Sequence, residues 1–142
     1  MTAHARASRG AGFTLVEVAI VLVVVTLLAS VAWPSVQAHL VKSRRSDAVA
    51  ALMRVQWAQE QYRAHHGLYA SQLQHLQPQG GSLSAEGLYA IALRPAGPDG
   101  YLATARARPE RGQAGDRDCL ELTLDVHEGR ASPGPTLRCW NR

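Results

Sequence analysis

The sequence predicts an α+β fold in which one long N-terminal helix packs on a small antiparallel sheet. Three patterns in the 142-residue chain support this prediction. Residues 18–38 contain no charged side chain, residues 41–62 repeat apolar residues at helical spacing, and residues 120–126 alternate apolar with polar residues. The length supports one domain with an appendage and excludes a multidomain enzyme.

The apolar N-terminal segment allows three interpretations. In the first it is a secretory signal peptide cleaved after Ala32, although such apolar regions usually have only about 7–15 residues. In the second it is a plain transmembrane anchor, because residues 13–33 span about 31 Å as a helix and a bilayer core is about 30 Å thick. Neither interpretation explains Glu17. A carboxylate in hydrocarbon costs on the order of 2.5 kcal/mol or more, so it normally marks a function or a partner.

The third interpretation follows from the motif around Glu17. This residue is the fifth counted from Phe13, which follows Gly12 in the string Gly-Ala-Gly-Phe-Thr-Leu-Val-Glu, with basic residues upstream. The motif resembles the N-terminus of type IV pilins, in which a membrane aspartyl peptidase cuts a short basic leader after a glycine. The resemblance implies cleavage between Gly12 and Phe13, N-methylation of Phe13, and a role for Glu17 in subunit assembly. It also implies the pilin fold, although the resemblance is strong only over residues 12–63 and absent over residues 67–87.

The same resemblance implies a set of partners and a location. Glu17 is expected to pair with the terminal amine of a neighbouring subunit, which compensates two charges in an apolar filament core. The implied partners are other pilin subunits in a helical filament, the prepilin peptidase and an inner-membrane assembly platform. The precursor is expected to cross the bacterial inner membrane once and then to enter an extracellular pilus. Pro34 stands where type IVa pilins have a helix kink, whereas Thr26 and Arg54 replace a common glycine and a common second proline.

The helical pattern continues beyond the apolar segment and ends at His66, with Gly67 as the C-terminal cap. Five apolar positions on one face are expected to cover the sheet: Val41, Ala48, Leu52, Val55 and Tyr62. Five charged positions are expected mostly off that face: Arg44, Arg45, Arg54, Glu60 and Arg63. A second apolar line of Val49, Met53 and Trp57 has two interpretations. It either faces a neighbouring subunit or lies under a connecting loop.

The predicted organisation has three parts: a leader at residues 1–12, a helix at residues 13–66 with its transmembrane part at about 13–38, and a globular head at residues 67–142. The head is expected to begin with a polar linker at residues 67–87, punctuated by Pro78 and Gly80-Gly81. Three strands are predicted, at residues 88–94, 101–108 and 119–126, and glycine- and proline-rich turns separate them. Turn residues from Gly129 to Pro135 are expected to lead the chain to its C-terminal segment.

Cys119 and Cys139 are the two cysteines of the chain. They are too few for a zinc site with four thiolates. Behind a membrane-targeting segment, they indicate a disulfide formed in an oxidising compartment, and two buried free thiols are the alternative. Closing a loop of this size would stabilise the fold by roughly 3 kcal/mol on a chain-entropy estimate. The order of strands, cysteines and the final Cys139-Trp140 also resembles the C-terminal part of many type IVa pilins.

The sequence contains no recognisable catalytic or metal-binding arrangement. Its six histidines have no metal-ligand spacing, and Asp116, Asp118 and Asp125 lack the spacing of an EF-hand loop. A net charge of +4 does not by itself indicate nucleic acid. The chain is therefore predicted to be neither an enzyme nor a cofactor-binding protein.

Four arginines surround the predicted turn between the second and third strands and are candidates for DNA phosphate contacts: Arg106, Arg108, Arg111 and Arg117. Acidic residues stand among them, and no aromatic side chain interleaves for base stacking. A solvated charged loop is the favoured interpretation of this segment. The predicted function is a structural minor pilin that serves pilus assembly, adhesion, twitching motility or DNA uptake. A type II secretion pseudopilin and a DNA-binding competence pilin are the alternatives.

Overall fold

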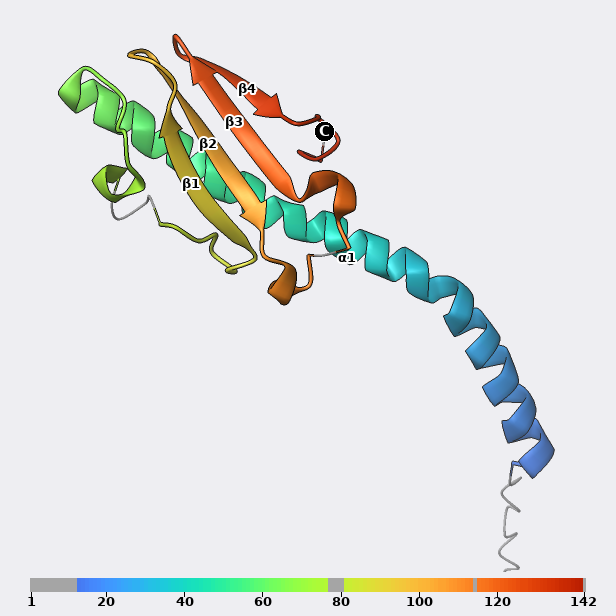
Figure 1. Ribbon diagram of the computed structural model, residues 1–142. Coiled ribbons are helices and arrows are strands. Elements are labelled where there is room, and N and C mark those ends of the chain that lie inside the picture. Colours follow the sequence, from blue (N-terminus) through green and yellow to red (C-terminus); the bar gives the residue numbers. More distant parts are fainter. Residues whose placement is uncertain (1–12, 77–80, 114, 142) are drawn as a thin grey trace, which may run out of the picture. The chain divides into compact units, whose positions relative to one another are not determined.

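The computed structural model describes residues 13–76, 81–113 and 115–141 (Figure 1). It has the predicted α+β architecture, with one long helix and a four-stranded antiparallel sheet. The helix and strands are α1 (Leu15–His66), β1 (Tyr89–Pro95), β2 (Gly100–Ala107), β3 (Glu121–His127) and β4 (Arg130–Gly134). Three short 3-10 helices lie between them: η1 (Leu73–Leu76), η2 (Pro109–Arg111) and η3 (Arg117–Cys119). The chain divides into two compact units, Met1–Gln37 and Ala38–Arg142.

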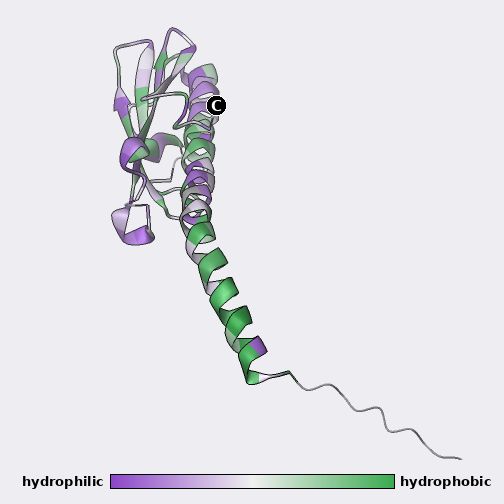
Figure 2. Cartoon of the chain, turned by 90° about the vertical axis from the view of Figure 1, so that its right-hand side faces the viewer, coloured by the Kyte–Doolittle hydropathy of each residue, from purple (hydrophilic) through white to green (hydrophobic). Residues whose placement is uncertain are grey.

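The described part of the first unit consists of the N-terminal part of α1 and the residues just before it. Its large apolar side chains are all exposed, from 47% at Val18 to 86% at Leu15. The helix is long and apolar enough to cross a membrane, with a mean hydropathy of 2.8 in its most apolar stretch (Figure 2). The hydroxyl groups of Thr26 and Ser30 donate to the carbonyls of Leu22 and Leu27. They are therefore satisfied within the helix, as an apolar environment requires.

The start of α1 is capped by Thr14. The backbone N–H of Glu17 donates to the Thr14 hydroxyl oxygen at 3.2 Å, which satisfies one of the free donors at a helix N-terminus. The spacing of Thr14 and Glu17 is that of a capping box, and a carboxylate in the first turn also suits the helix dipole. Glu17 thus has a local role at the helix start as well as the predicted one in assembly. The helix continues through position 34, and the kink expected at Pro34 stays a prediction.

In the second unit, the C-terminal part of α1 packs against one face of the sheet (Figure 1). Three residues of the predicted helix face, Ala48, Leu52 and Val55, are buried, and Val41 and Tyr62 are half-buried. The sheet contributes inward-pointing side chains from every second position, such as Leu122, Leu124 and Val126 in β3. The helical and strand periodicities of the sequence therefore meet in one core.

The strand order β1-β2-β3-β4 follows the chain, and each pair is antiparallel. The three predicted strands are confirmed, with ends shifted by one or two residues. The prediction that the chain only turns after Gly129 is wrong, because β4 forms a fourth strand there. Pro133 is compatible with this strand because β4 lies at the edge of the sheet, where a missing N–H does not break the ladder.

The linker after α1 contributes to the core. Gly67 has the left-handed conformation expected of a helix C-cap, with φ of 76°. The buried Gln59 side chain then exchanges two hydrogen bonds with the backbone of Ala70, at 2.8 and 2.9 Å. Tyr69 and Leu76 are buried as well, so the segment is less polar in structure than in composition. The predicted turn residues Pro78 and Gly80 lie outside the described residues.

Candidate functional site

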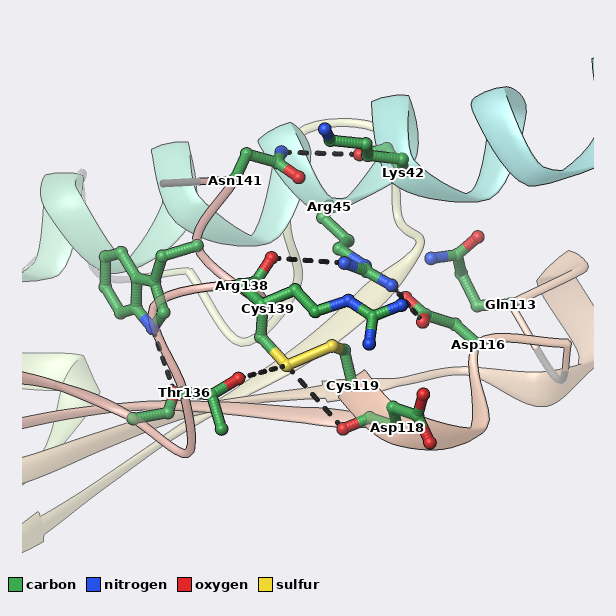
Figure 3. Close-up of a disulfide and its surroundings, with 12 residues drawn as sticks. Lys42, Arg45, Gln113, Asp116, Asp118, Cys119, Thr136, Arg138, Cys139 and Asn141 are labelled. Carbon is green, nitrogen blue, oxygen red and sulfur yellow. Dashed lines mark hydrogen bonds and ion pairs between the residues drawn. A yellow bond between two sulfur atoms is a disulfide. The ribbon is translucent and has the colours of Figure 1, made fainter.

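The segment from Cys119 to Cys139 is closed by a disulfide (Figure 3). The two Cα atoms are 5.5 Å apart, and both residues are 1% exposed. The predicted disulfide is therefore confirmed, and the alternative of two free thiols is wrong. The bond joins η3, at the end of the β2–β3 connection, to the C-terminal residues that follow β4.

Arg45 forms a buried ion pair with Asp116. Its Nε and Nη2 donate to the two carboxylate oxygens at 2.7 and 2.6 Å, and the side chains are 10% and 2% exposed. The expectation that Arg45 lies off the packed face of the helix is wrong. Helical periodicity places residue 45 one turn before Ala48, on the same side, and an acidic partner from a distant loop makes a charge tolerable there. The hydrogen bonds that Arg45 donates to Asp116 raise the pKa of Arg45.

The Arg45–Asp116 ion pair occupies one of the three aspartates that were considered as calcium ligands. Both carboxylate oxygens of Asp116 accept hydrogen bonds from Arg45, so this residue is not a free ligand. Within the described residues, no three His, Cys, Asp or Glu side chains are grouped to hold a metal ion.

Further contacts seat the β2–β3 connection and the C-terminal residues on α1. Arg44 Nη1 donates to the carbonyl of Gly112 at 3.0 Å, and Asn141 Nδ2 donates to the carbonyl of Lys42 at 3.3 Å. The fully buried Gln113 donates to the Tyr89 hydroxyl at 2.6 Å. Two chain segments that are distant in sequence are thus fixed to one short stretch of helix (Figure 3).

The candidate DNA-contacting arginines are not equivalent in the structure. Arg108 is half-buried, and it donates to Glu110 at 2.8 Å and to the carbonyl of Gly87 at 3.1 Å. Arg106 is exposed on the outer face of the sheet, 3.7 Å from the carboxylate of Glu121. Arg111 is exposed, and within the described residues no carboxylate lies within ion-pair distance of it.

Two more arginines share the features of Arg111. Arg117 and Arg138 are exposed, and in the described part of the chain neither has a carboxylate within ion-pair distance. The disulfide joins the two backbone segments that carry them, because Arg117 is two residues before Cys119 and Arg138 directly precedes Cys139. We call Arg111, Arg117 and Arg138 the basic surface.

Sequence reasoning included Arg117 in the loop but missed Arg138, whose position depends on the disulfide. The cysteine pair was the signal that would have placed Arg138 next to Arg117. The carboxylate of Glu110 lies beside Arg111 in the chain but pairs with Arg108, and its own backbone N–H and Arg108 hold the pKa of its carboxyl below the usual range, so it stays ionised.

Two of the three residues in the second apolar line on α1 are exposed. Met53 is 38% and Trp57 54% exposed, whereas Val49 packs against the core. Ser46 and Ala50 precede them on the same helix face and are also exposed. The described loops do not cover Met53 and Trp57, so the structure favours the interpretation in which they face another molecule. We call Ser46, Ala50, Met53 and Trp57 the helix stripe.

The positions of the assembly motif lie at the start of the first unit. Phe13 is 81% exposed and Glu17 is exposed, while Gly12 and the leader lie outside the described residues. Residues 8–33 match the prokaryotic N-terminal methylation motif. The chain is therefore a membrane-anchored precursor that becomes part of an extracellular pilus.

Residues 34–123 match the family described as "Type IV minor pilin ComP, DNA uptake sequence receptor". No curated protein matches the chain. The resemblance to type IV pilins is confirmed, and pilins of this kind are structural subunits. The match also favours a pilus subunit over a type II secretion pseudopilin. This chain belongs to the family of type IV minor pilins described as ComP, DNA uptake sequence receptors.

Proposed function

We propose that this minor pilin is cut between Gly12 and Phe13, methylated at Phe13, and held in the filament by α1. The match of residues 8–33 to the N-terminal methylation motif supports the processing, and the exposed apolar surface of residues 13–33 supports the anchoring. A surface of this kind is stable in a lipid bilayer, and outside the membrane it must be covered by other apolar surfaces. The prepilin peptidase, other pilin subunits and the inner-membrane assembly platform are the proposed partners.

Glu17 is proposed to pair with the terminal amine of an adjacent subunit. An unpaired carboxylate among apolar helices costs several kcal/mol, and so does an unpaired ammonium group. We expect Glu17→Ala and Glu17→Gln to lower the amount of this subunit in sheared pili strongly, at an unchanged level in the membrane. Immunoblots of the two fractions measure this, with Glu121→Ala, which changes an exposed carboxylate of the head, as the control. Unchanged pilus content of both Glu17 variants would contradict the pairing.

The helix stripe is proposed to contact the apolar helix of a neighbouring pilin subunit. Met53 and Trp57 are large, exposed and uncharged, and they continue on the same helix that carries the apolar segment. We expect Trp57→Glu to lower incorporation into pili while the thermal unfolding of the head changes little, since the side chain is exposed. Leu68→Glu is the matched control, because Leu68 is a similarly exposed apolar residue outside the stripe. Equal effects of the two variants would rule out a specific contact.

We further propose that the head binds DNA through the basic surface. The description of the family as DNA uptake sequence receptors supports this, together with three exposed arginines that have no ion-pair partner among the described residues. This proposal replaces the preference for a merely solvated loop. Arginines without carboxylate partners are available to bind phosphate oxygens, and the disulfide joins the backbone segments that carry two of them.

The DNA proposal is tested with the full chain in detergent micelles and fluorescein-labelled double-stranded DNA. We expect the triple variant Arg111→Gln/Arg117→Gln/Arg138→Gln to lower affinity by roughly 100-fold and to reduce the salt slope by about 0.9 for each lost phosphate contact. The control variant Arg54→Gln/Arg94→Gln/Arg130→Gln changes three other exposed arginines and so has the same net charge as the triple variant. Binding that is absent, independent of salt, or equally weakened in the control would contradict the proposal.

A further inference from the structure

Arg45 contacts both segments that carry the basic surface. Two of its nitrogens bind the Asp116 carboxylate, and Nη1 donates to the backbone carbonyl of Arg138 at 3.2 Å. Asp116 directly precedes Arg117 in the chain. One side chain of α1 is therefore bonded to the residue next to one exposed arginine and to the backbone of another (Figure 3).

The disulfide alone does not produce this arrangement. It joins Cys119 to Cys139, but neither cysteine belongs to α1. The backbone around Asp116 is itself tied to the rest of the connection, since its N–H donates to the carbonyl of Gln113 and its carbonyl accepts from Cys119. Arg45 is thus bonded to both of the disulfide-linked segments, whereas the Arg44–Gly112 and Asn141–Lys42 contacts each hold one of them on the helix.

Arg45 has little direct contact with solvent, since its side chain is 10% exposed. Its charge is also compensated by Asp116, so the pair adds nothing to the net charge of the surface. Any influence of Arg45 on DNA binding must therefore be exerted through the position of its neighbours.

We propose that Arg45 is a positioning residue for DNA binding, which sets the spacing of Arg117 and Arg138 without contacting the nucleic acid. This inference rests on the proposed binding of DNA by the basic surface. Phosphates occur at fixed intervals along a DNA strand, so arginines held at one spacing bind them with less loss of conformational freedom than mobile ones.

The test uses the double variant Arg45→Met/Asp116→Asn in the full chain. It removes the ion pair and the bond to the Arg138 carbonyl, but it loses one positive and one negative charge and so keeps the net charge. Replacing a buried ion pair by neutral residues of similar size is often tolerated, so the variant is expected to fold. We expect its affinity for the double-stranded DNA probe to fall roughly tenfold and its salt slope to decrease by about 0.9, the value of one phosphate contact.

Two controls separate positioning from general destabilisation. Leu52→Ala removes a fully buried core side chain and should cost about 2–5 kcal/mol of stability, but it should leave DNA affinity unchanged as long as the protein stays folded. The single variant Arg45→Lys keeps the positive charge but loses the bidentate geometry. Its DNA affinity should lie between that of the double variant and that of the wild type. Amide hydrogen exchange should be faster at Cys119 and Asn141 in the double variant, because their N–H groups bond to the carbonyls of Asp116 and Arg138.

The outcomes distinguish this inference from the proposed function. If the wild type binds DNA and the triple arginine variant does not, wild-type affinity of the double variant overturns the positioning role alone. If the wild type does not bind DNA, both proposals fail. Equal losses of affinity in Leu52→Ala and in the double variant, at equal stability, would also overturn the inference.

Discussion

Tyr101 is fully buried beside Tyr69, with the two rings 4.9 Å apart in an edge-to-face arrangement. Within the described residues, its hydroxyl group has no hydrogen-bond partner. An unpaired buried hydroxyl loses its hydration without compensation, which costs about 1–3 kcal/mol. Burial also raises the pKa of Tyr101, and it raises the pKa values of Tyr69 and Tyr89 in the same direction.

Because burial raises the pKa values of these tyrosines, we expect the protein to lose stability in alkali. Below a pH of about 10, the phenols are protonated in both the folded and the unfolded chain. In that range their ionisation does not make the free energy of unfolding depend on pH. Above that pH the unfolded chain releases protons that the folded chain retains, so the free energy of unfolding falls as pH rises. Denaturant unfolding at several pH values between 8 and 11 measures this fall in the free energy of unfolding. The arginine side chains keep their charge throughout that range.

Tyr101→Phe is the matching substitution. It should raise the free energy of unfolding at neutral pH by about 1 kcal/mol, because it removes the unpaired hydroxyl and keeps the ring. It should also make the alkaline decline less steep. A variant that is less stable than the wild type by 1 kcal/mol or more would indicate that the hydroxyl has a partner.

At the scale of single residues, sequence reasoning identified the arginines and aspartates but not which of them pair. Arg45 and Asp116 are 71 positions apart, and periodicity carries no information on such a contact. The same limit applies to Arg138, whose segment is joined to that of Arg117 by the disulfide. Residue types were therefore predictable, while their partners depended on tertiary structure.

Among the elements, the β3–β4 hairpin turns at Glu128 and Gly129, which have φ values of 50° and 77°. Two residues with positive φ form the turn type that suits the twist of a hairpin. Glycine adopts this conformation freely, whereas for most L-residues it costs roughly 1–2 kcal/mol.

Because Glu128 has a positive φ, we expect Glu128→Asn to stabilise the protein. Asparagine tolerates the left-handed conformation better than glutamate, so the free energy of unfolding should rise by about 1 kcal/mol. Thermal unfolding of the full chain measures this change. Glu86→Asn, at an exposed loop position, is the control for the general effect of removing a carboxylate, and a gain there of the same size would contradict the turn argument.

Elements with strong periodicity were predictable from the sequence, and irregular ones were not. The apolar positions of α1 and the alternation in β3 placed the core correctly, because period determines which side chains share a face. β4 was missed because Pro133 and Gly134 indicate a turn in sequence, and only the neighbouring β3 makes this segment a strand. The linker buries Tyr69 because Gln59 binds its neighbour Ala70, a contact without a sequence signature.

At the scale of the whole molecule, assembly and recognition fall on different parts of the chain. The apolar segment of α1, Glu17 and the helix stripe are proposed to serve the filament, and the basic surface of the head is proposed to serve DNA. The predicted bounds of leader, helix and head stay predictions. The pilin family was predictable because its motif is local, whereas the basic surface was only partly predictable because it combines two distant segments.

The central claim is that the chain is processed at Gly12 and anchored by an apolar helix that remains attached. The intact mass of the protein extracted from purified pili tests this most directly. We expect the mass of residues 13–142 with one added methyl group and two hydrogens fewer for the Cys119–Cys139 disulfide. A mass corresponding to a chain that starts at Trp33, or that retains any residue before Phe13, would contradict it.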